Sequence, residues 1–275
     1  MLRKAKEEDL PQVLKLWSVS FNEDENFNNW YFDNVYKADN TIVYEDNGMI
    51  IAMLQMLPYE ITNLGKVSYI FGACTMPEYR GKGIMASLIA YSEELDRQSG
   101  IKASILIPQN ESLFNFYDRF GYEPYFKIAS KDYSVQMKKD HPHSFLKCTT
   151  DDIAQLNRLY EDSLFEIDYV KRTESDWETQ INMFKALGGD TFCLKDNNEI
   201  VGYAFVWNEE TPLIQELAGK TTEIKDILAN EILRYYSKEK AQAFILDGIP
   251  TQLLGSIKFY DKQIKKLYYM NLMFN

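Results

Sequence analysis

The sequence has few of the residues on which metal sites and covalent catalysis usually depend. It contains three cysteines, Cys74, Cys148 and Cys193, and two histidines, His141 and His143. The cysteines show no close pairing and no metal-ligand spacing, which predicts reduced thiols. The histidines flank a proline and no third ligand is evident, so we expect surface histidines and no metal site.

Long apolar runs and an excess of basic charge are also missing. No apolar run approaches the ~20 residues that span a bilayer, and the charged opening MLRKAKEEDL is not followed by the apolar core of a signal peptide. We therefore expect a cytoplasmic protein with no membrane partner. The net charge of −11 argues against nucleic acid as a partner, and is compatible with solubility alone or with a cationic substrate such as an amine.

What is present is the composition of a folded protein with two domains. Hydrophobic residues make up 45% of the chain and charged residues 26%, which excludes a disordered chain, and 275 residues suffice for two ordinary domains. The segment KKDHPHSFLKCTT, residues 138–150, is charged and rich in turn-forming residues. We therefore predict a first domain at residues 1–138 and a second at residues 139–275.

One stretch of the first half has the pattern of a strand, a basic glycine loop and a helix. Residues 71–76 are small or apolar, Pro77 ends the strand, and apolar residues from Ile84 to Leu95 recur on one helical face. The first turn of a helix has N–H groups without acceptors and carries partial positive charge. We predict an anion site here, with a basic surface turn as the alternative. The loop consists of Arg80, Gly81, Lys82 and Gly83.

Two common nucleotide motifs do not fit the chain. The dinucleotide fingerprint needs a third glycine where the loop has Ala86, and no acidic ribose partner stands out about 20 residues further on. The stretch AGKTT at residues 218–222 looks like the end of a P-loop, but Ile214 stands where the first glycine belongs.

The loop resembles the acetyl-CoA loop of the GNAT superfamily of N-acetyltransferases. In PEYRGKGIM, Arg80 and Gly83 match the pattern of Arg or Gln, two residues, Gly, one residue, then Gly or Ala, and Met85 departs from it. The segment NESLFNFYDRFGYEPY, residues 110–125, is similar to a second conserved segment of that superfamily. Together the motifs cover roughly residues 1–130. The resemblance implies an α/β fold, a mixed central sheet flanked by helices, with acetyl-CoA as co-substrate.

The same resemblance implies the roles of individual residues. Tyr117 would protonate the departing CoA thiolate, which a tyrosine near its reference pKa of ~10 can do at neutral pH; the alternative is a core tyrosine. Asn110 would bond the pantetheine arm or only cap its helix. A backbone N–H near Thr75 or Met76 would polarise the thioester carbonyl. The expected cofactor-binding residues are Cys74, Thr75, Met76, Arg80, Gly81, Lys82, Gly83, Ile84, Met85 and Asn110, with Cys74 a strand residue rather than a nucleophile.

Residues 21–36, FNEDENFNNWYFDNVY, interleave aromatic and acidic side chains. They predict either a polar loop and a short helix packed on the sheet, or an acceptor cleft with aromatic walls and carboxylates for a cation. A general base is not identified, and an acidic residue or a chain of waters would serve equally. The candidate substrate-binding residues are Glu23, Asp24, Glu25, Trp30 and Glu216.

The second half repeats the first in outline, with an opening helix, a hairpin around Asn197-Asn198, a strand at residues 213–217 and a further helix. No Arg-x-x-Gly follows that strand, and the late segment with Tyr260 lacks Gly-Tyr. We therefore expect a degenerate acetyltransferase-like domain that does not bind CoA. Such a tandem resembles the enhanced-intracellular-survival type of acetyltransferase, in which the second domain helps to wall the acceptor site.

The function implied by the resemblance is transfer of an acetyl group from acetyl-CoA to a primary amine of a small molecule or peptide, by direct attack on the thioester. Two alternatives remain open. One is a CoA-binding regulatory or interaction protein that moves no acyl group. The other is a transferase for a longer acyl group, which depends on the room around Met85.

Overall fold

The computed structural model divides the chain into two compact units, and it describes residues 1–21, 25–137, 140–261 and 268–271. The first unit comprises Met1–Phe126 and Leu254–Lys265, and the second comprises Lys127–Leu253 and Lys266–Asn275. The expected boundary at residues 138/139 therefore differs from the structure, because the second unit begins at Lys127 and a late segment belongs to the first. No helix among the described residues is both long and apolar enough to cross a membrane.

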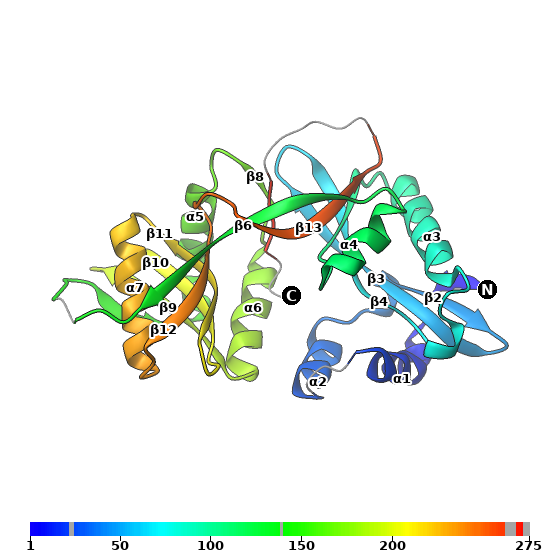
Figure 1. Ribbon diagram of the computed structural model, residues 1–275, viewed down its shortest axis with the longest axis horizontal. Helices are drawn as coiled ribbons and strands as arrows, with labels where there is room; N and C mark the ends of the chain where they lie inside the picture. Colours follow the sequence, from blue (N-terminus) through cyan, green and yellow to red (C-terminus); the bar gives the residue numbers. More distant parts are fainter. Residues whose placement is uncertain (22–24, 138–139, 262–267, 272–275) are drawn as a thin grey trace. The chain divides into compact units, whose positions relative to one another are not determined.

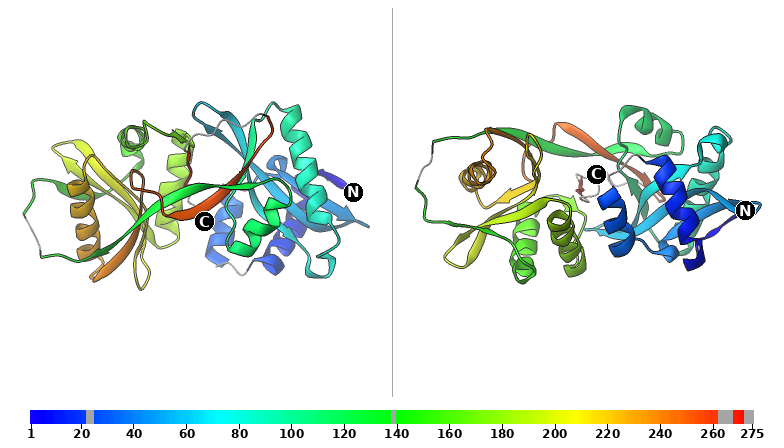
Figure 2. Two further views of the ribbon diagram at one scale, coloured as in Figure 1. Left: turned by 45° about the horizontal axis from the view of Figure 1, so that its top comes forward. Right: turned by 90° about the horizontal axis from the view of Figure 1, so that it is seen from below.

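The first unit is a mixed α/β fold, as expected. Its strands follow the order β1-β2-β3-β4-β5-β13, and among its described residues only β4 and β5 pair in parallel. Helices α1 and α2 lie on one side of this sheet, and α3 and α4 on the other (Figures 1 and 2). The elements are β1 (Leu2–Lys4), α1 (Leu10–Ser20), α2 (Glu25–Asn34), β2 (Thr41–Asp46), β3 (Met49–Ile61), β4 (Gly65–Thr75), α3 (Ile84–Gln98), β5 (Ala103–Leu106), α4 (Glu111–Asp118) and β13 (Gln252–Phe259).

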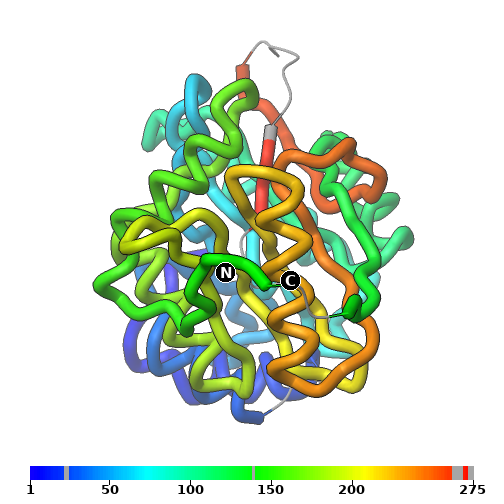
Figure 3. Tube along the Cα trace, turned by 90° about the vertical axis from the view of Figure 1, so that its left-hand side faces the viewer, coloured from blue at the N-terminus to red at the C-terminus, as the bar shows by residue number. Residues whose placement is uncertain are grey.

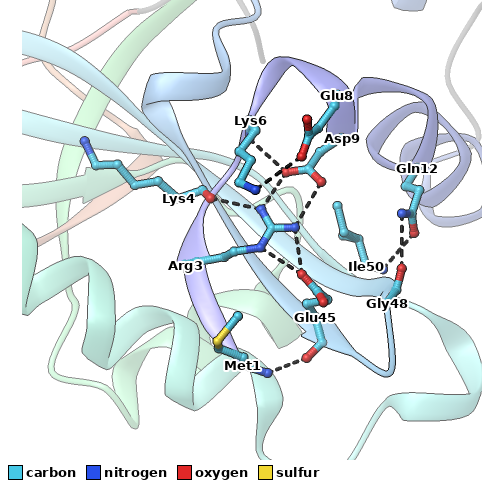
Figure 4. Close-up of polar contacts among 10 residues, drawn as sticks. All are labelled: Met1, Arg3, Lys4, Lys6, Glu8, Asp9, Gln12, Glu45, Gly48 and Ile50. Carbon is cyan, nitrogen blue, oxygen red and sulfur yellow. Dashed lines mark hydrogen bonds and ion pairs between the residues drawn. The ribbon is translucent and has the colours of Figure 1, made fainter.

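A tight hairpin turn at Asp46-Asn47-Gly48 joins β2 to β3 and holds the first helix. Asn47 and Gly48 have φ angles of 48° and 80°, the left-handed pair that a tight hairpin turn requires. The Gln12 amide of α1 accepts from the Ile50 N–H at 2.9 Å and donates to the Gly48 carbonyl at 3.3 Å (Figure 4). Close by, the Arg3 guanidinium donates to Asp9 at 2.6 Å. Helix α1 is thereby held against β2 and β3.

The second unit has a sheet of the same kind, in the order β7-β9-β10-β11-β12-β6. Helices α5 and α6 lie on one side and α7 on the other (Figure 2), and α7 can be followed into β12 in Figure 3. The elements are β6 (Glu123–Ser134), β7 (Ser144–Lys147), α5 (Ile153–Ser163), β8 (Asp168–Tyr169), α6 (Glu174–Ala186), β9 (Gly189–Asp196), β10 (Glu199–Trp207), β11 (Leu213–Gly219), α7 (Thr222–Tyr235), β12 (Lys240–Ile245) and β14 (Tyr268–Tyr269), which pairs with β8.

The repetition predicted from the sequence extends to single contacts. Gln155 of α5 accepts from the Ile200 N–H at 2.9 Å and donates to the Asn198 carbonyl at 3.3 Å. These are the contacts that Gln12 makes with its own hairpin in the first unit. The two units therefore share a fold down to the way in which their opening helix meets the first hairpin.

The late segment that the sequence assigned to the second half completes the sheet of the first. Strand β13 pairs antiparallel with β5, and the hydroxyl of Tyr260 donates to the buried Asp96 of α3 at 2.6 Å. The Arg97 guanidinium donates to the Tyr260 carbonyl at 2.9 Å. Tyr260 is therefore a structural anchor of the first unit, and not the counterpart of Tyr117 in the second.

Two cysteines that are far apart in sequence lie side by side in the second unit. Cys193 on β9 faces Leu146 of β7, and the Cys148 N–H donates to the carbonyl of Thr191 at 2.8 Å. The thiol of Cys193 and burial raise the pKa of Cys148. All three cysteines are buried free thiols, and no group of residues that could hold a metal ion occurs in the described part of the chain.

Candidate active site

Strand β4 carries a β-bulge and then loses its neighbour on one side. Met53 of β3 pairs with Cys74, whereas Gln55 pairs with Phe71, so β4 has one extra residue, with Gly72 at a φ of +57°. The ladder with β5 ends at the pair Tyr69–Ile105, although β4 continues to Thr75. The β5 side of residues 72–75 therefore has no strand partner among the described residues, and an extended ligand can pair with such an edge.

The basic glycine loop begins where this strand ends. Gly81 and Gly83 have φ angles of 75° and 78°, and a Cβ at either position would meet no atom within 4 Å. Glycine is therefore required at both positions by the backbone conformation, and not because a side chain would clash with its surroundings. The Arg80 side chain donates from Nε to the carbonyl of Thr75 at 3.0 Å, and the Lys82 ammonium lies 4.7 Å from the centre of the Tyr79 ring. The loop is therefore tied to the end of β4.

The first turn of α3 has no cap of its own. Its N-cap residue is Gly83, which has no side chain to accept a hydrogen bond, and no acceptor among the described residues reaches the N–H groups of residues 81–86. Arg80 and Lys82 are exposed, and neither forms an ion pair with an acidic side chain among the described residues. Free amides, a helix N-terminus and two cations without acidic partners are the kind of groups that can bind a phosphate anion.

The equivalent junction in the second unit is closed by its own side chains. The Thr221 hydroxyl accepts from the Ile224 N–H at 3.2 Å and so caps α7. The Lys220 ammonium pairs with Glu199. A Cβ on Gly219 would lie 2.8 Å from the Lys225 side chain, so this glycine is packed closely against α7. The side-chain cap and the ion pair found here have no counterpart among the described residues at the junction of the first unit.

Tyr117 lies on α4, which begins at Asn110. The Asn110 side chain accepts from the Leu113 N–H at 3.1 Å, so the capping role expected for it is confirmed. The Tyr117 ring is buried, and its hydroxyl has no hydrogen-bond partner among the described residues. Burial, and then the neighbouring Cys74, raise the pKa of Tyr117 to about 12. Tyr117 is therefore protonated at neutral pH, as a general acid must be.

Cys74 lies between the end of α1 and α4 and is no nucleophile. Burial raises the pKa of its thiol to about 12, and the Ser20 hydroxyl and Arg80 offset only part of that rise. Because the thiolate is the reactive form, the expectation of a strand residue fits the structure. The influence of Cys74 on Tyr117 also places the end of β4 beside α4.

The two backbone amides predicted to polarise the thioester carbonyl, those of Thr75 and Met76, differ in their hydrogen bonding. The Met76 N–H donates to the Ile51 carbonyl at 2.8 Å, so it is committed to strand β3 and that prediction is wrong for Met76. Thr75 pairs with Ala52 of β3, and its carbonyl is occupied by Arg80. The Ile84 and Met85 side chains belong to the hydrophobic core, and only their amides are without acceptors.

The residues predicted to bind the acceptor differ in exposure and belong to two units. Glu23 and Asp24 lie outside the described residues, Glu25 is exposed at the start of α2, and Trp30 is half-buried against the core. Glu216 is fully buried in the second unit, which contradicts a role in acceptor binding.

Both carboxylate oxygens of Glu216 already accept hydrogen bonds from neighbouring side chains. It accepts from both terminal nitrogens of Arg172, at 2.6 and 2.7 Å. The hydroxyls of Tyr203 and Tyr269 each donate to it at 2.8 Å. Arg172 also lies over the rings of Tyr160 and Trp177. This group is a structural ion pair of the second unit.

Sequence reasoning missed the bulge in β4 and the aromatic packing against it. A Cβ on Gly72 would lie 2.5 Å from Cζ3 of Trp17 and 3.2 Å from Nε2 of Gln55. A glycine inside a strand pattern often marks a bulge or the close approach of another group. Gly72 could therefore have predicted the bulge from the sequence. Nothing local in the sequence indicated that Trp17 is its partner.

Comparison with known proteins gives the same picture of the first unit. Residues 1–125 match the sequence model of the acetyltransferase (GNAT) domain. A curated relative, the S-alkylcysteine N-acetyltransferase of Bacillus subtilis (strain 168), is 32% identical over 106 residues, which are 36% of this chain and 60% of the relative. The chain thus spans less than two thirds of that relative.

Solved structures share the fold of nearly the whole chain. The GCN5-related N-acetyltransferase from Anabaena variabilis ATCC 29413 superimposes with a TM-score of 0.75 at 17% identity, over 95% of this chain and 73% of that protein. Eis1 from Mycobacterium abscessus gives a TM-score of 0.66 at 12% identity, over 95% and 74%. The predicted mixed α/β fold is therefore confirmed, and residues 1–125 are similar to an acetyltransferase (GNAT) domain.

Proposed function

We propose that the protein is an acetyl-CoA-dependent N-acetyltransferase that acts on a primary amine of a small molecule or peptide. The observation that carries the proposal is the run of backbone amides at residues 81–86 without acceptors, beside an open strand edge. The pyrophosphate would bind these amides, with Arg80 and Lys82 adding charge. The pantetheine arm would pair with the open edge of β4.

The reaction follows from the groups at the end of β4. The neutral amine attacks the thioester carbonyl, a C–N bond forms and the C–S bond breaks. The leaving thiolate takes the proton of Tyr117, the nitrogen of the product loses its extra proton to solvent, and the tyrosinate takes up a proton from solvent. The Thr75 N–H is the remaining candidate donor to the carbonyl oxygen as it gains negative charge. The position of Tyr117 on α4, near enough to Cys74 of β4 for the thiol to affect its pKa, supports this role.

The curated relative acts on an S-alkylcysteine, according to its name, and therefore on a small amine. That kinship favours a small acceptor for this chain as well. The second unit, with its closed junction, would bind no acetyl-CoA.

A thiol-release assay with acetyl-CoA and a panel of amines tests the proposal. Release that depends on the amine supports transfer, and Tyr117→Phe should lower kcat by ~10²–10⁴-fold with little change in KM for acetyl-CoA. A regulatory CoA-binding protein would bind the cofactor and release no thiol with any amine. If Tyr117→Phe kept wild-type turnover and only its Tm fell, Tyr117 would be a core residue without a catalytic role.

A further inference from the structure

A group of aromatic side chains in the first unit is packed against the bulge of β4. We call it the aromatic wall, and its members are Trp17, Phe21, Phe27, Phe32 and Phe71. The Trp17 ring lies 4.6 Å from Phe21, 5.2 Å from Phe32 and 5.8 Å from Phe71, between ring centres. Trp17 is buried, whereas the four phenylalanines keep part of their surface exposed.

The wall reaches the place where the acetyl group would lie. Phe71 directly precedes the bulge, and the edge of Trp17 fits so closely that a Cβ on Gly72 would lie 2.5 Å from it. At the end of α1, the Ser20 hydroxyl lies beside Cys74 and lowers its pKa. Because Cys74 also acts on Tyr117, the end of α1 and the proposed acid both adjoin the last residues of β4.

Hydrogen bonds behind the wall hold it in one arrangement. The Trp17 indole donates to the Asn28 side chain at 2.7 Å, which ties α1 to α2. Tyr31 stacks on Trp17 at 5.4 Å, and its hydroxyl donates to Gln55 at 2.7 Å. The wall is therefore formed before a ligand arrives, and a ligand that packs on it has little ordering cost to overcome.

The charge of α1 and α2 favours an ammonium group near the wall. These helices carry the exposed acids Glu25 and Asp33 and one basic residue, Lys15, which is also exposed. The faces of aromatic rings carry negative potential and attract ammonium groups. The partly exposed ring surface favours an apolar tail on the same ligand, because burying apolar surface is favourable.

We propose that the acceptor is a primary amine with an apolar alkyl or aryl tail, and that the tail packs on the aromatic wall. This assignment rests on the acetyltransferase activity proposed above, and it goes beyond that proposal by naming the kind of tail.

The experiment compares kcat/KM for acetylation of two amines that differ in their tail. Phenethylamine should exceed ethanolamine by about tenfold or more, because an apolar pocket discriminates on that scale. Equal values for the two amines, or preference for ethanolamine, would overturn the assignment. Absence of transfer to every amine would instead overturn the proposed activity, and this assignment with it.

Variants locate the effect on the wall. Phe21→Ala should lower the ratio of kcat/KM for phenethylamine to kcat/KM for ethanolamine by about tenfold. Phe145→Ala, which removes a half-buried ring from the second unit, serves as the matched control and should not change this ratio. Should Phe21→Ala fail to fold in a melting curve, Phe27→Leu keeps much of the volume and tests the same selectivity. Unchanged selectivity in a folded wall variant would refute the role of the wall.

Discussion

Replacing Glu216 with glutamine tests whether this carboxylate belongs to the fold or to the acceptor site. Its side chain is fully buried, and that of Arg172 is 2% exposed, so the pair has almost no access to water. Breaking a buried ion pair by changing one partner typically costs ~3–5 kcal/mol, because the other charge is left uncompensated. The amide in Glu216→Gln would retain the tyrosine contacts in part, which places the expected loss at the lower end, ~3 kcal/mol.

Urea unfolding followed by circular dichroism measures that loss. The exposed pair Lys6–Glu8, with side chains 62% and 75% exposed, supplies the control, and Glu8→Gln should change the free energy of unfolding by less than ~0.5 kcal/mol. At a temperature where Glu216→Gln is folded, KM for the amine should equal that of the wild type. Near-normal stability together with a raised KM for the amine would refute the structural role and restore Glu216 as an acceptor ligand.

Three further outcomes are expected. Tyr260→Phe removes the hydroxyl that bonds to Asp96 and should lower the free energy of unfolding by ~1–3 kcal/mol in urea titration; an unchanged value would contradict the anchoring of β13. Since the pKa of Tyr117 is raised to about 12, kcat should not fall up to about pH 10, the ordinary tyrosine pKa, and a decline with an apparent pKa near that value that is absent in Tyr117→Phe would contradict its burial. The three cysteines are buried, so a thiol reagent should react with none of them rapidly in the native protein and with all of them in urea; a fast-reacting native thiol would show that a site opens.

Much of the fold could be predicted because its signals are local. The hairpins at Asn47-Gly48 and Asn197-Asn198, the glycine loop and the cap at Asn110 each depend on a few neighbouring residues, and all are present. The repetition of elements in the second half follows from the same short patterns. The helix start at Gly83 could be placed because a positive φ favours glycine.

The remainder depends on contacts between residues that are distant in sequence. Strand β13 joins β5 across more than half of the chain, and no local pattern assigns it to the first unit. Glu216 looked like a free carboxylate because its partner Arg172 lies in a different part of the unit's sequence. The commitment of the Met76 amide to Ile51 depends on strand register, which hydrophobic alternation alone does not fix in a strand buried on both faces.

The most direct test of the account is isothermal titration of the intact protein with acetyl-CoA, comparing wild type, Gly83→Glu and Gly100→Glu. Both glycines have positive φ, 78° and 72°, and a Cβ added at either would meet no atom within 4 Å. They lie at opposite ends of α3, so the two variants carry similar backbone strain at different places. We predict one acetyl-CoA per chain for wild type and for Gly100→Glu. Gly83→Glu should show no binding, because its carboxylate would lie against the pyrophosphate. Equal affinity in all three proteins, or two molecules bound per chain, would contradict the assignment of the cofactor site.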